Sequence, residues 1–179
     1  MAGLPSFSDT GFSLYPRQGF RSLAIGLGAG LVFGGWMALA DNTFLASVVP
    51  TSQQAILAST TPLERILAFS RGAAGDEVAL RLITMNGLIW LLMAITQRRG
   101  SGIYWAAIGM TAFIAWPLWA LAYVTSLDWS ALTVLREVAL HGAAGTLWGW
   151  LCWRHGWLAG LTGHIGAHLA LQPLLALTA

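Results

Sequence analysis

Long apolar stretches separated by short polar segments dominate the chain. Five of them are close to the roughly 20 residues that an α-helix needs to cross the hydrocarbon layer of a bilayer. They are residues 22–40, 76–96, 103–126, 131–153 and 156–177. The pattern predicts an all-α membrane protein, a single-domain bundle of about five transmembrane helices plus one short interfacial helix.

The polar segments predict how the spans are joined. Residues 1–21 are polar and mixed, and predict an N-terminal tail that ends in a basic flank. Residues 41–60 are rich in serine and threonine and predict a loop. The basic start and small-residue end of span 22–40 also fit a cleaved secretory signal, although its apolar run is long for one. Residues 154 and 155 alone separate the last two spans, which predicts a tight antiparallel hairpin.

A short helix is predicted between the first two spans. Thr61 is expected as its N-cap, with Pro62 at the first helical position and Glu64 placed to close a capping box. The amphipathic pattern of residues 62–71 predicts a helix that lies at the membrane interface. Residues 72–75, which contain two glycines, are expected to end it.

Glycines also mark one face of the first span. Gly26, Gly30 and Gly34 recur every four residues. Small residues at this spacing let a second helix approach closely. We expect a close helix–helix contact along this face.

Composition agrees with a membrane protein and excludes other classes. Hydrophobic residues make up 56% of the 179 residues and charged residues only 9%, against about 25% in soluble domains. The net charge of +2 is scattered, so no basic patch for nucleic acid is present. The single cysteine, Cys152, excludes an intrachain disulfide and a cysteine-rich metal site.

Arginine placement predicts the orientation of the bundle. With five spans, five arginines fall on one side: Arg17, Arg21, Arg98, Arg99 and Arg154. The positive-inside rule then places the N-terminus in the cytoplasm and the C-terminus outside. Arg65 and Arg71 fall on the outer side and weaken this assignment.

Several ionisable groups lie inside the predicted spans, where they are costly and therefore mark candidate functional sites. They are Asp76, Glu77, Arg81, His141, His164 and His168. Glu77 and Arg81 are four residues apart and predict a same-face ion pair, which leaves Asp76 free to take a proton. His164 and His168 have the same spacing and share a face.

These groups can meet inside the membrane. At about 1.5 Å per residue, His141 and His168 both reach the middle of the bilayer, while Asp76 begins its span nearer the outer side. A carboxylate and a histidine that converge on one water form a general base, and further imidazoles can stabilise an oxyanion. The expected chemistry is amide hydrolysis without a covalent intermediate, at a site in the outer half of the membrane.

The motifs resemble those of the CPBP (CAAX protease and bacteriocin-processing, or Abi) family of intramembrane glutamic-type proteases. Residues 76–81 resemble its Glu-Glu-x-x-x-Arg motif, with Asp76 in place of the first glutamate. His141 matches the histidine of Phe-x-x-x-His, with Glu137 in place of the phenylalanine. Residues 149–159 resemble the family's Gly-x-Leu-Tyr-x-Arg-x-Gly-x-Leu run.

The third motif of the family is a histidine followed four residues later by asparagine or aspartate. His164 matches it, and His168 replaces the second member. By resemblance, Asp76 and His141 would activate water, while His164 and His168 would support the oxyanion. The resemblance covers residues 76–171.

The resemblance implies a metal-independent endopeptidase, without a cofactor, in the plasma (inner) membrane of a prokaryote. Its partners would be the lipid bilayer and a membrane-anchored protein or peptide, cut near a C-terminal sorting or anchor segment. It leaves open whether Asp76 or Glu77 is the base. Glu137 has no family role, and is either a polar partner of His141 or a variant site residue.

Other interpretations remain open. Three histidines and a carboxylate can bind catalytic zinc, which would make the protein a zinc-dependent membrane hydrolase. The substitutions at Asp76 and His168 also fit an inactive family member with an immunity or scaffolding role. In purely structural terms, Asp76 is an N-cap, Glu77 and Arg81 a packing ion pair, and His141 a link between helices.

Overall fold

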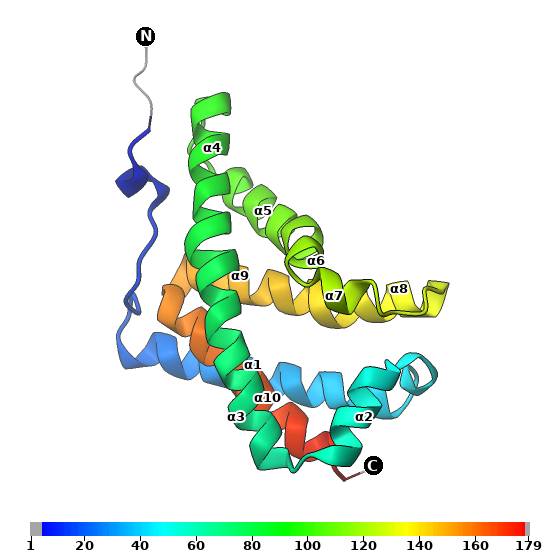
Figure 1. Ribbon diagram of the computed structural model, residues 1–179. Helices are drawn as coiled ribbons and strands as arrows, with labels where there is room; N and C mark the ends of the chain where they lie inside the picture. Colours follow the sequence, from blue (N-terminus) through cyan, green and yellow to red (C-terminus); the bar gives the residue numbers. More distant parts are fainter. Residues whose placement is uncertain (1–4, 178–179) are drawn as a thin grey trace.

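The computed structural model describes residues 5–177, which form helices and short connections with no strand among them (Figure 1). The all-α prediction is confirmed. The helices are η1 (Phe7–Thr10), α1 (Phe20–Asn42), η2 (Ala46–Val48), α2 (Thr51–Ser59), α3 (Pro62–Asp76), η3 (Glu77–Met85), α4 (Asn86–Thr96), α5 (Ser101–Met110), η4 (Thr111–Ala115), α6 (Trp116–Trp119), α7 (Leu121–Val124), α8 (Ala131–Glu137), η5 (Val138–Gly142), α9 (Ala143–His155) and α10 (Trp157–Leu175). Turns η1 and η2 are 3-10 helices, and η3, η4 and η5 are π-helical.

Three stretches of the described chain are long and apolar enough to cross a membrane. They are Phe20–Asn42, Pro62–Thr96 and Ser101–Trp119. The C-terminal helices are interrupted by polar residues, such as His164 and His168 in α10, which lower their mean hydropathy. Residues 5–177 are therefore all-α, with three candidate membrane spans.

The second of these stretches corrects the expectation of a break at residues 72–75. Helix α3 continues through η3 into α4 as one helical segment of 35 residues. The expected interfacial helix 62–71 and span 76–96 are parts of this segment. Glycine costs about 1 kcal/mol in a helix interior. Packing of α3 on α10, with Ala73 only 2% exposed, offsets that cost.

The start of α3 agrees with the sequence. Thr61 Oγ1 accepts a hydrogen bond from the Glu64 amide at 3.3 Å, and the Glu64 carboxylate accepts one from the Thr61 amide at 2.7 Å. Pro62 occupies the first helical position. The predicted capping box is confirmed.

The segment before α1 is docked on the helices rather than free. The Trp90 indole N–H donates to the Pro5 carbonyl at 2.8 Å, and the Trp157 amide donates to the Ser13 carbonyl at 2.8 Å. In Figure 1 the segment runs beside α4. The expected loop at residues 41–60 likewise contains a helix, α2. Residues 1–4 of the predicted tail lie outside the described residues.

The predicted glycine face of α1 packs directly on α10. A Cβ atom added at Gly30 would lie 2.0 Å from the Gly163 carbonyl oxygen. One added at Gly26 would lie 2.3 Å from the carbonyl oxygen of Ala159. The backbones of α1 and α10 are therefore in direct contact, and the expected close approach is confirmed.

The last two long helices form the predicted hairpin. Helix α9 ends at His155 and α10 begins at Trp157, so Gly156 alone joins them. Its φ of 96° lies in the left-handed region that glycine adopts without strain. This turn brings α9 and α10 side by side, and with them the residues of the candidate site.

Candidate active site

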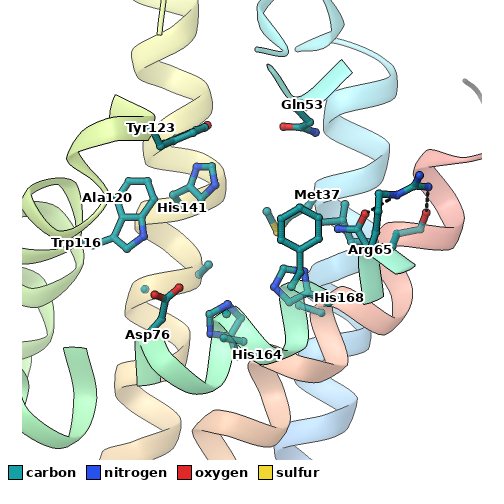
Figure 2. A pocket seen from close by; sticks show the side chains of 18 of the residues that line it. Met37, Gln53, Arg65, Asp76, Trp116, Ala120, Tyr123, His141, His164 and His168 are labelled. Atoms are coloured by element: carbon teal, nitrogen blue, oxygen red, sulfur yellow. Dashed lines mark hydrogen bonds between the residues drawn. The ribbon is translucent and has the colours of Figure 1, made fainter. Parts of the chain in front are cut away.

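A cavity of about 380 Å³ lies among α1, α2, α3, α6, α9 and α10. Figure 2 shows His141, His164, His168 and Asp76 around it. All of the ionisable residues predicted from the sequence line this cavity: Asp76, Glu77, Arg81, His141, His164 and His168. The structure thus brings together groups that lie up to 92 positions apart in the sequence.

Two of the π-helical turns carry residues of the cavity wall. Turn η3 holds Glu77 and Arg81, and η5 holds His141. Such turns free a backbone carbonyl and occur often at functional sites. The Thr84 hydroxyl donates to the Ala79 carbonyl at 2.8 Å, which satisfies one of the carbonyls in η3. Sequence periodicity did not predict these turns.

Glu77 is buried, with 1% of its surface exposed, and has several partners. Its Oε1 lies 3.0 Å from His164 Nδ1, and its Oε2 lies 3.9 Å from Arg81 Nε. The Cys152 thiol lies 3.8 Å from Oε2. Arg81 also donates to the Gly145 carbonyl at 3.0 Å. Glu77 and Arg81 therefore pair as their spacing predicted, and His164 is a third member of the group.

Asp76 does not act as the helix N-cap that the sequence allows. Its backbone is helical, with φ −62° and ψ −42°, and its side chain caps no backbone amide. Its Oδ1 accepts a hydrogen bond from the Trp119 indole N–H at 2.8 Å. Because α3 begins at Pro62, Asp76 lies about 20 Å along a continuous helix. The expected position at the outer end of a span is therefore corrected.

His141 is enclosed by aromatic rings. It stacks on Trp116 with ring centroids 4.7 Å apart and contacts Tyr123 edge-on at 5.4 Å. Its Nδ1 lies 2.7 Å from Oε2 of Glu137. Helix α6, which is short and follows the π-helical turn η4, supplies Trp116. Trp116 and Tyr123 thus contact the imidazole ring, and Glu137 contacts its Nδ1 atom.

His164 and His168 form a stacked pair, with ring centroids 5.3 Å apart. Phe69 stacks on His168 at 5.4 Å, and Trp148 stacks on His164 at 5.6 Å. The Nδ1 atom of His168 is buried and has no hydrogen-bond partner within residues 5–177. The hydrogen-bonding capacity of this nitrogen is therefore unmet among the described residues.

A buried polar network adjoins His141 and was not identified from the sequence. Arg136, 1% exposed, donates to both carboxylate oxygens of Asp41 at 2.8 Å and to Gln53 at 2.9 Å. It also donates to Glu137 at 2.8 Å. An arginine within an otherwise apolar stretch was the available signal. Its partner Asp41 is the first residue of the segment 41–60, which the sequence predicts as a loop.

The positions of the histidines and carboxylates indicate whether they could bind zinc. Within residues 5–177, no three histidine, cysteine, aspartate or glutamate side chains come close enough together to hold a metal ion. His164 contacts Glu77, whereas His141 contacts Glu137, so the two imidazoles pair with different carboxylates. The described geometry therefore favours two carboxylate–imidazole pairs over a zinc site.

No protein-family model, curated protein or solved structure matches the chain. The similarity to the CPBP family thus consists of the short motifs alone. The residues around the cavity are the remaining indication of function.

Proposed function

We propose that the protein is an intramembrane endopeptidase of the CPBP type. It would hydrolyse a peptide bond in a membrane-anchored protein, with a water activated by a carboxylate and a histidine and without a metal ion. The observation that carries the proposal is the convergence of Asp76, Glu77 and three histidines on one cavity lined mostly by apolar side chains. Ionisable groups gathered in such a cavity are a common basis of acid–base chemistry.

Asp76 and His141 are the proposed water-activating groups. Both line the cavity, and Asp76 keeps one carboxylate oxygen, Oδ2, beyond the one that Trp119 holds. Stacking on Trp116 keeps the His141 ring in place. A water between them would lose its proton as its oxygen attacks the substrate carbonyl carbon.

His164 and His168 are the proposed donors to the oxyanion. With its Nδ1 on the Glu77 carboxylate, a protonated His164 offers Nε2–H to the developing charge. Arg81 keeps Glu77 in place as its ion-pair partner. His168 adds a second ring on the same face, one helical turn further along α10.

The proposed setting is a five-span bundle, in which residues 131–155 and α10 complete the three candidate spans. The buried ion pair of Arg136 with Asp41 makes a span with this arginine more acceptable in lipid. The N-terminus would be cytoplasmic and the C-terminus outside, in a prokaryotic inner membrane. The substrate would enter from the bilayer, and an anchored C-terminal sorting segment fits this route.

Proteolysis in proteoliposomes tests the proposal. The purified protein is given a pool of membrane-anchored peptides, with and without a strong chelator. We expect cleavage that survives the chelator and falls by at least about 10²-fold in His141→Ala and in Asp76→Asn, the usual loss when an acid–base group is removed. His155→Ala is the matched control, because His155 is the last residue of α9 and does not line the cavity.

Two results would contradict the proposal. Cleavage that is lost with the chelator and restored by zinc would support the zinc hydrolase instead. A folded wild type that cleaves no peptide, with a cellular phenotype that His141→Ala leaves intact, would support an immunity or scaffolding role.

A further inference from the structure

Glu137 and His141 form a carboxylate–imidazole pair that the motif comparison does not explain. The Glu137 Oε2 and His141 Nδ1 atoms are 2.7 Å apart. Both atoms are buried, and neither forms a hydrogen bond of regular geometry within residues 5–177, so the pair is a close ion-pair contact rather than an aligned hydrogen bond. Buried polar atoms in proteins are nearly always paired, and at 2.7 Å two unprotonated acceptors would repel each other. An ionised carboxylate can only accept, so Nδ1 carries the proton.

The other oxygen of Glu137 is already occupied. Its Oε1 accepts hydrogen bonds from Arg136 Nη1 at 2.8 Å and from the Tyr123 hydroxyl at 3.0 Å. Arginine has donors only, so Oε1 must act as an acceptor. Arg136 cannot turn away, because Asp41 holds its Nε and Nη2. Glu137 is therefore fixed, with Oε2 directed at His141.

We propose that Glu137 is a positioning residue that holds His141 in the Nδ1–H tautomer and leaves Nε2 as an unprotonated acceptor facing the cavity. The ring lines the cavity and its side chain is 26% exposed, whereas Nδ1 is buried. The bond at one ring nitrogen sets the role of the other. The tautomer rests on this geometry alone.

The catalytic consequence rests on the proposed function. Nε2 takes a proton from the attacking water, whose oxygen bonds to the substrate carbonyl carbon. The imidazolium then formed is stabilised by Glu137, and Nε2 returns the proton to the leaving amine nitrogen. Asp76, which also lines the cavity, would then orient the same water.

The substitution Glu137→Gln should change which ring nitrogen of His141 carries the proton. Arg136 can only donate, so the amide oxygen of glutamine takes the place of Oε1. The amide NH₂ group then faces Nδ1 of His141, which must become an acceptor. The ring proton moves to Nε2, and the tautomer is inverted.

Nitrogen NMR of the full chain in lipid bilayers, labelled with ¹⁵N-histidine, measures this directly. The His141 signals are identified by their loss in His141→Gln. We expect protonated Nδ1 in the wild type and protonated Nε2 in Glu137→Gln. Tyr123→Phe is the matched control, since it removes one donor to Oε1 but keeps Arg136, and should retain the wild-type tautomer.

Protonated Nε2 in the neutral His141 of the wild type would overturn the inference, even if Glu137→Gln did not fold. So would an Nδ1–H signal that persists in a folded Glu137→Gln. If the wild type shows peptidase activity, Glu137→Gln should lower kcat with little change in KM. The expected tautomers in a wild type that cleaves no peptide would contradict the proposed function only.

Discussion

Replacing Gly30 with leucine is expected to prevent α1 from packing on α10 and to remove most of the folded protein. A Cβ atom at this position would lie 2.0 Å from the Gly163 carbonyl oxygen and 3.0 Å from the Ala167 amide nitrogen. Overpacking costs about 1–3 kcal/mol when side chains can shift, and here the obstacle is backbone. The thermal unfolding midpoint and the monodisperse fraction in detergent measure the loss.

Gly28→Leu is the matched control for this prediction. Gly28 is on the same helix, and a Cβ atom there would meet nothing within 4 Å. It should leave the unfolding midpoint nearly unchanged. Equal losses in both variants would show that leucine is tolerated poorly anywhere in α1, and would contradict a close contact at Gly30.

The second large effect is expected for Arg136→Met. The substitution leaves the Asp41 carboxylate buried, 5% exposed, without the guanidinium that pairs both its oxygens. Breaking a buried ion pair from one side costs about 3–5 kcal/mol. The free energy of unfolding in denaturant, measured in mixed micelles, should fall by this amount.

Two further variants test whether the stability lost in Arg136→Met comes from the broken ion pair or from removing any charge. Adding Asp41→Leu to Arg136→Met should recover much of the stability, because an apolar pair often replaces a buried ion pair at little cost. Arg99→Met breaks an exposed pair with Asp9 and should cost less than about 1 kcal/mol. A double variant no more stable than Arg136→Met would argue against the ion pair as the cause.

The sequence determined the features that depend on local helical periodicity. Glu77 and Arg81, four residues apart, lie on one face because a helix places them there. The same rule predicted the face shared by His164 and His168 and the glycine face of α1. The capping box at Thr61 depends only on residues three positions apart.

Only the tertiary structure decided which helix faces meet. The Glu77 partner His164 is 87 positions away, and Arg136 and Asp41 are 95 positions apart. The continuation of α3 through residues 72–75 also depends on a neighbour, since packing against α10 outweighs the low helix propensity of glycine. A helical pattern specifies the face that a residue occupies, but packing of distant helices selects its partner.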